Sequence, residues 1–159
     1  MKEGTDQFKV TKRFVLAGKA IFTCHNDKGV WFTYKVVHKP ADKSYPENWF
    51  VSLLVGPDNN SQYAYLGILS RSTGQVILTK KSCRKQDHLS VKVLNWAMKV
   101  IWEDRIFPDG YGCHGEGRCG RCGRRLTAEP GVNPEGFRFG FGPICWEAVG
   151  GVNVQAVNI

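Results

Sequence analysis

Length, composition and charge limit what this protein can be. The chain has 159 residues, of which 42% are hydrophobic and 23% are charged. This is the composition of a globular protein of about one domain, and it argues against wholesale disorder. The 22 Lys and Arg residues outnumber the 14 Asp and Glu residues and give a net charge of +8. Such a charge favours a polyanion such as nucleic acid as partner.

The lengths of the apolar runs argue against a membrane protein. No run approaches the roughly 20 residues that a membrane-spanning helix needs, and residues 1–6 lack the apolar segment of a secretory signal. We therefore expect a cytoplasmic protein with no membrane partner. In a reducing compartment its six cysteines are expected to be thiols or metal ligands rather than disulfides.

Five stretches in the first half of the chain have the residue types of β-strands. The first two, residues 20–25 and 30–37, flank the turn Asn26-Asp27-Lys28-Gly29, which is a good hairpin signal. The other three are residues 49–55, 63–69 and 75–79, with turn residues between them. Together they predict an antiparallel meander of about five strands. Residues 1–19 are basic and are interpreted as an arm or a first strand.

A long amphipathic helix is expected after these strands. Asp87 can cap its N-terminus, and apolar residues recur at helical spacing from Leu89 to Trp102. Because the apolar positions cover a wide arc, the sheet should cover most of the helix. We therefore predict an α+β fold over residues 1–109, in which an antiparallel sheet of about five strands packs on one long helix.

The composition changes after Gly110. Glycine becomes frequent, long apolar runs disappear, and four of the six cysteines lie between Cys113 and Cys145. A segment that can bury so little core needs a cross-link. We therefore predict that residues 110–159 form a zinc-binding module with a short final helix.

The cysteine spacing identifies the candidate cross-link. Cys119 and Cys122 form a C-x-x-C turn, in which both sulfurs can reach one metal ion. Cys145 follows a Gly-Pro pair, where the N-terminus of a short helix would favour its thiolate. The fourth ligand of a structural zinc ion, one per chain, is open between His114 and its neighbour Cys113. The alternative is a redox-active cysteine pair, which usually needs a thioredoxin-like βαβ context that this sequence lacks.

Residues 114–127, HGEGRCGRCGRRLT, and residues 140–145, GFGPIC, carry a resemblance to a known family. The family consists of small, largely uncharacterised proteins common in phages and mobile elements of actinobacteria, with a C-terminal zinc-finger-like segment. The resemblance spans roughly residues 20–148 and implies Cys119, Cys122 and Cys145 as ligands, with His114 as the fourth. The sequence departs from the family at residues 132–138, which lengthen the loop before Cys145. The family implies no established activity.

Arginines and aromatic residues gather around the C-x-x-C turn. Four arginines fall within eight residues, and Arg138 lies between two phenylalanines further on. A planar guanidinium positioned by a metal site suits phosphate contacts, and exposed rings beside it could stack on unpaired bases. The alternative is a solvated basic rim over a small aromatic core. The net charge favours the nucleic-acid interpretation, in which the contacting residues are Arg118, Arg121, Arg124, Arg125 and Arg138.

The sequence contains no catalytic motif. It has no phosphate-binding Gly-rich loop, no H-E-x-x-H and no local Ser-His-Asp set. We therefore expect a non-enzymatic nucleic-acid-binding zinc protein of phage or mobile-element type, with DNA and RNA both open. The alternative is a module that binds a host or phage protein complex. Examples are a phage-encoded, anti-CRISPR-like inhibitor of a host nuclease or defence complex, and a subunit of a nucleoprotein effector.

Overall fold

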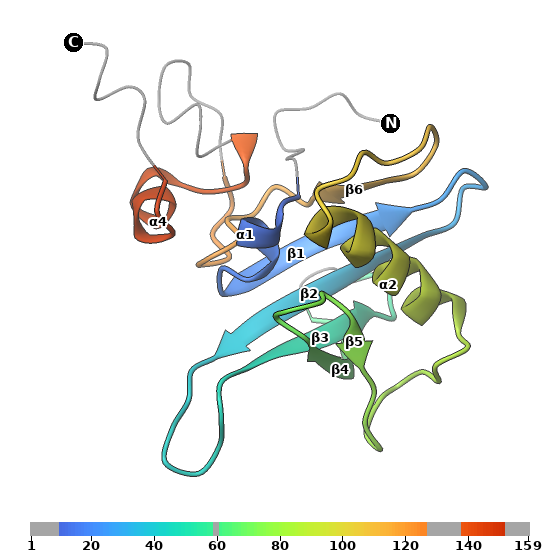
Figure 1. Ribbon diagram of the computed structural model, residues 1–159, viewed down its shortest axis with the longest axis horizontal. Coiled ribbons are helices and arrows are strands. Elements are labelled where there is room, and N and C mark those ends of the chain that lie inside the picture. The colour runs from blue at the N-terminus through green and yellow to red at the C-terminus, as the bar shows by residue number, and fades with distance from the viewer. Residues whose placement is uncertain (1–9, 59–60, 127–137, 152–159) are drawn as a thin grey trace.

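Residues 10–58, 61–126 and 138–151 are described by the computed structural model of the chain. They contain one antiparallel sheet of six strands in the order β5-β4-β3-β2-β1-β6 (Figure 1). The strands are β1 (Lys19–His25), β2 (Trp31–Lys39), β3 (Asn48–Leu54), β4 (Tyr63–Leu69), β5 (Val76–Ile77) and β6 (Gly112–Gly115). The helices are α1 (Lys12–Val15), α2 (Leu89–Trp102) and α4 (Pro143–Ala148).

The β1–β2 hairpin forms where the sequence predicts it. The side-chain oxygen of Asn26 accepts hydrogen bonds from the backbone N–H groups of Lys28 (2.9 Å) and Val30 (3.1 Å). Gly29 has a φ of 77°, which an L side chain rarely adopts. The asparagine and the glycine thus supply the two features that this turn needs.

The sheet differs from the prediction at both edges. It has six strands rather than about five, because β6 pairs with β1. At the other edge, β5 has two residues and is shorter than the predicted strand 75–79. β6 comes from the segment that the sequence assigns to the C-terminal module, and it covers backbone groups of β1 that would otherwise be unpaired.

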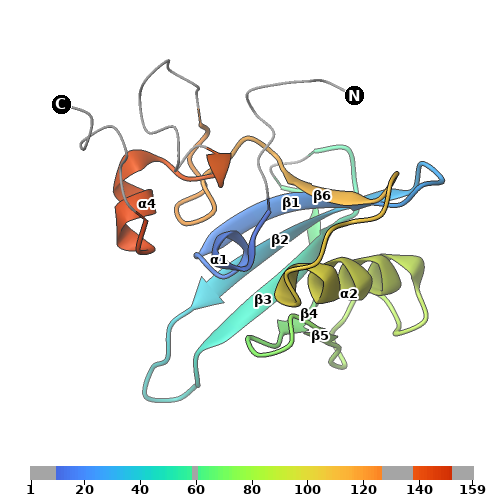
Figure 2. The same cartoon turned by 45° about the horizontal axis from the view of Figure 1, so that its top comes forward.

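The helical layer is not the single long helix that the sequence predicts. α2 runs over 14 residues, but α1 lies on the same side of the sheet and buries Phe14 and Val15 completely (Figure 2). α1 is missed because four residues are too few to show a helical period. The N-cap of α2 is His88 rather than Asp87, since His88 Nδ1 accepts the backbone N–H of Ser90 at 3.1 Å.

Alternation along the strands turns one face of the sheet toward these helices. Phe22 on β1, Tyr34 on β2 and Leu53 on β3 are fully buried there. They pack in one core with Leu94 and Met98 of α2. Burial of side chains of this size is the main stabilising contribution to the sheet.

The same core extends into the last third of the chain. Cys119, Phe141, Cys145 and Trp146 belong to the buried cluster that contains the sheet side chains. The predicted division at residue 109 stays a prediction, and residues 132–137 of the lengthened loop lie outside the described residues. None of the helices in the described part of the chain has the length and apolar character needed to cross a bilayer.

Candidate metal centre and its basic surroundings

Three of the four predicted metal ligands lie together. The sulfur atoms of Cys119, Cys122 and Cys145 are all within 4.8 Å of one another. Cys119 and Cys145 are buried, and Cys122 is exposed. In a tetrahedral site with Zn–S distances of about 2.3 Å, sulfurs are about 3.8 Å apart, so the spacing suits one shared ion. The prediction that these cysteines come together is confirmed.

Two tight turns bring the cysteines together. The backbone N–H of Gly123 donates to the carbonyl oxygen of Cys119 at 2.9 Å, which closes the C-x-x-C turn, and Gly123 has a φ of 78°. Gly120 lies against α1, where an added Cβ would stand 2.6 Å from the ring of Phe14. Cys145 lies in the first turn of α4, as the Gly-Pro sequence predicts. The glycines thus permit a close approach that larger residues would block.

The surroundings shift the pKa values of the two buried thiols in opposite directions. Burial alone would raise the pKa of Cys119, but backbone N–H groups of Cys122 and Gly142 that point at its sulfur lower the pKa. The pKa of Cys145 is raised by burial and by the neighbouring thiols, although Arg121 Nη1 opposes this from 3.5 Å. Three thiolates this close repel one another unless a cation lies between them. The group is therefore suited to a thiophilic cation.

Neither candidate for the fourth ligand lies in this group. His114 is on β6 opposite Thr23, and its Nε2 is 3.3 Å from Glu116 Oε2. Cys113 points to the opposite face of the sheet from His114, and its sulfur lies 3.3 Å from the sulfur of Cys24. In the described ranges, no further His, Cys, Asp or Glu joins the three cysteines. The structure does not bring His114 to them, and the identity of a fourth ligand stays a prediction.

Four of the five predicted arginines lie in or next to the C-x-x-C turn. Arg121, Arg124 and Arg125 are exposed, while Arg118 is half-buried and donates from Nη1 to the carbonyl oxygen of Gly123 at 3.2 Å. Arg138 is exposed, with its guanidinium carbon 5.5 Å from the centre of the Phe139 ring. Their use in binding nucleic acid stays a prediction.

Basic residues from the start of the chain lie beside these arginines. The backbone N–H of Lys19 donates to the carbonyl oxygen of Gly120 at 2.7 Å, and the exposed Lys19 side chain lies against Gly123. Arg13 of α1 lies over the ring of Trp146, 5.2 Å from its centre. The sequence shows these residues as basic, but only the packing of α1 and β1 against the turn makes them neighbours of the cysteines. We call the exposed set the basic surface; it consists of Arg13, Lys19, Arg121, Arg124 and Arg125.

Comparisons of the chain with protein-family models, with curated proteins and with solved structures found no match. The motif resemblance described above, and the origin that it implies, therefore stay predictions.

Proposed function

We propose that this protein binds nucleic acid through the basic surface, and that one structural zinc ion at Cys119, Cys122 and Cys145 stabilises that surface. The observation that carries the proposal is that cationic side chains from two segments far apart in the sequence lie around one cysteine group. Charges that serve only solubility have no need to be gathered in this way.

Zinc is the metal that best fits three cysteines. Soft thiolate ligands select zinc, copper(I) or iron–sulfur clusters, and zinc is the usual ion of a C-x-x-C turn in a small structural site. Its role here would be mechanical. The turn carries Arg121, Arg124 and Arg125 within or just after the C-x-x-C sequence, so a bound ion would limit the movement of their backbone. Donors that are ordered before binding lose less entropy on reaching phosphates.

Salt-dependent binding tests the basic surface directly. Arg124→Ala and Arg125→Ala should each weaken binding to an oligonucleotide and flatten the plot of log affinity against log salt by about 0.7 to 0.9 units, the counterion release of one phosphate contact. Lys28→Ala is the matched control, because it removes one exposed cation at the hairpin turn, away from α4 (Figure 1). Arg121 is left unchanged, since its contact with Cys145 would confuse binding with metal retention.

If all three variants show the same slope of log affinity against log salt, the interaction is diffuse charge attraction without specific phosphate contacts. Absence of affinity in the unsubstituted protein at low salt would reject the proposal and favour the second candidate, a module that binds a protein complex. For that candidate the residue to substitute first is Ile144, which lies next to Cys145 on α4 and is 80% exposed. Ile144→Glu would then abolish partner binding. That the chain is not an enzyme stays a prediction.

A further inference from the structure

Two cysteines outside the metal centre face each other across strands β1 and β6. Cys24 of β1 is the register partner of Cys113 of β6, and their sulfur atoms are 3.3 Å apart. Neither belongs to the group of three cysteines that could hold a metal ion. The two residues are 89 positions apart in the sequence, so the pairing of β6 with β1 is what brings them together.

The pair lies where neighbouring strands bring their side chains closest. In an antiparallel ladder, hydrogen-bonded and non-hydrogen-bonded pairs alternate. The N–H of Glu116 donates to the carbonyl oxygen of Ile21 at 3.4 Å, so these two residues form a hydrogen-bonded pair. Counting along the register from there makes Cys24 and Cys113 a non-hydrogen-bonded pair. The Cα atoms of such a pair are about 4.5 Å apart, within the range of about 4.4 to 6.8 Å that disulfides require.

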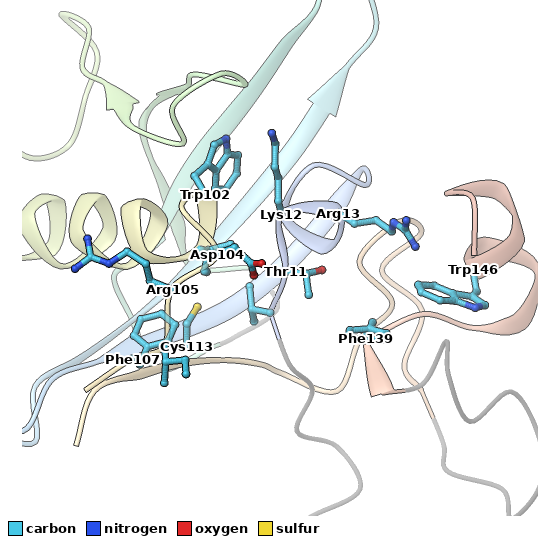
Figure 3. Close-up of a pocket in the computed structure, with 13 residues that line it drawn as sticks. Thr11, Lys12, Arg13, Trp102, Asp104, Arg105, Phe107, Cys113, Phe139 and Trp146 are labelled. Carbon is cyan, nitrogen blue, oxygen red and sulfur yellow. The ribbon is translucent and has the colours of Figure 1, made fainter. Parts of the chain in front are cut away.

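One of the two sulfur atoms can be reached from solvent. Cys24 is fully buried, whereas Cys113 is half-buried and lines a cleft of about 690 Å³ beside α1 and the end of α2 (Figure 3). A molecule as small as hydrogen peroxide can enter such a cleft. Burial, followed by the neighbouring Cys24 thiol, raises the pKa of Cys113. Little thiolate is therefore present at neutral pH, and the reaction with peroxide is slow.

Disulfide formation needs an oxidant that takes up two electrons, and a hydroperoxide is the class that fits the cleft. The thiolate of Cys113 attacks one peroxide oxygen, the O–O bond breaks, and the hydroxide that leaves takes up the thiol proton and becomes water. The thiol of Cys24 then attacks the sulfenic acid on Cys113, so that an S–S bond forms, the S–O bond breaks and a second water leaves. Two thiols are oxidised and one peroxide is reduced.

A bond at this position would fasten an edge strand. β6 has four residues, and in the described part of the chain it pairs with β1 alone. Its last residue, Gly115, precedes Cys119 by a few positions, so β6 leads directly into the C-x-x-C turn. A disulfide between β1 and β6 would hold the start of the cysteine-rich segment on the sheet by a covalent bond as well as by hydrogen bonds.

We infer that Cys24 and Cys113 are an oxidation site, at which a hydroperoxide forms a reversible disulfide that fastens β6 to β1 and keeps it there when the metal ion is lost. A cross-link between residues far apart in the sequence removes many of the open states that the reduced chain can reach. The inference does not depend on the proposed function, because nucleic acid takes no part in it.

Trypsin places the two cysteines on separate peptides, which allows the site to be identified directly. Cleavage after Lys and Arg leaves Cys24 as the one cysteine of residues 20–28 and Cys113 as the one cysteine of residues 106–118. The full-length protein, purified with its metal, is treated with hydrogen peroxide, its free thiols are alkylated, and the digest is analysed by mass spectrometry. The two peptides should be found linked, and dithiothreitol should separate them.

Cys113→Ser is the variant that isolates the pair, and Cys83→Ser is its matched control. Cys83 is also half-buried, but its sulfur lies 3.7 Å from the carbonyl oxygen of Ala64 and not beside another thiol. Cys113→Ser should give no linked peptide and should leave Cys24 free for alkylation once the protein is unfolded. Cys83→Ser should form the link to the same extent as the unsubstituted protein.

Hydrogen exchange after removal of the metal tests what the bond does. When a chelator takes up the metal, the amides of β6 should exchange at least about tenfold more slowly in the oxidised protein than in the reduced protein. Cys113→Ser that has been treated with peroxide should exchange like the reduced protein. This control separates the effect of the disulfide from oxidation at other residues.

Two kinds of result would overturn the inference. If peroxide oxidises Cys119, Cys122 and Cys145 and releases the metal while Cys24 and Cys113 stay reduced, the pair is no oxidation site. The same holds if the linked peptide forms only in denaturant. If the linked peptide forms in the folded protein but the amides of β6 exchange equally fast in both states, the disulfide does not fasten the strand.

Discussion

The sheet with α2 and the cysteine-rich segment after β6 are built from different kinds of contacts. In the sheet, large side chains such as Phe22, Tyr34 and Leu53 are fully buried and neighbouring strands share backbone hydrogen bonds. Residues 116–126 and 138–151 contain one short helix, several glycine turns and three cysteines in one group. Stability that is spread over many contacts tolerates the loss of one, whereas stability that depends on a metal centre does not.

Loss of the metal centre should have the largest effect. Cys119→Ser should remove the zinc ion, which elemental analysis should find at about one equivalent in the unsubstituted protein. Structural zinc sites stabilise small finger peptides by about 10 kcal/mol or more, so residues 116–126 and 138–151 should lose their order. Hydrogen exchange should show lost protection in those residues and retained protection in β1 to β4.

Cys83→Ser controls for the loss of a thiol. Cys83 is half-buried and lies outside the group, with its sulfur 3.7 Å from the carbonyl oxygen of Ala64. This variant should keep its zinc and its exchange pattern. If Cys119→Ser instead unfolds the whole chain, the two regions form one cooperative unit and the predicted division at residue 109 is wrong.

Phe14 joins the two regions, and its removal should have the next largest effect. The side chain is fully buried in α1, its ring lies 6.0 Å from that of Phe141, and Gly120 packs against it. Phe14→Ala should lower the free energy of unfolding by about 3 to 5 kcal/mol, the usual cost of emptying such a site. It should also speed the release of zinc to a chelator, because the C-x-x-C turn loses its support.

Ile106→Ala is the control for Phe14→Ala. Ile106 is 95% exposed, so the change in unfolding free energy should stay within about 0.5 kcal/mol. Denaturant unfolding measures the free energy of unfolding of both variants, and a colorimetric zinc indicator measures how fast they release zinc. Reduced stability with unchanged zinc release would show that α1 supports the sheet alone.

The smallest effect should come from a loop of the sheet region. The backbone N–H groups of Ser44 and Tyr45 each donate to the Asp42 carboxylate at 2.8 Å and lower its pKa. A carboxylate whose pKa is lower in the folded protein than in the unfolded chain stabilises the fold at pH values above the unfolded pKa. This stabilisation is lost as the pH falls through the pKa of the folded state, which lies below 3.8. Asp42→Ala should therefore be slightly less stable at neutral pH and equally stable in strong acid. Because Asp42 lies outside the group of three cysteines, zinc content should not change. A difference that persists in strong acid would exclude this carboxylate as its cause.

Local patterns predicted the parts of the fold that depend on local contacts. The Asn26 side chain and the positive φ of Gly29 complete the hairpin within one turn, and a helix of 14 residues is long enough to show its apolar period. The C-x-x-C spacing and the Gly-Pro before Cys145 predicted the three-cysteine group. The resemblance implied His114 as the fourth ligand, but this residue does not lie in the group of three cysteines. Pairing of β6 with β1 places it opposite Thr23 instead.

By itself, the sequence determined the α+β class, the hairpin, α2 and the meeting of three cysteines, because each depends on residues a few positions apart or on a strong chemical pattern. The tertiary structure decided the sixth strand, the burial of α1 and the placing of Arg13 and Lys19 beside the C-x-x-C turn. It also placed Cys113 opposite Cys24. These features depend on which distant surfaces bury each other and on which strand edges remain unpaired. A local sequence pattern predicts neither of these.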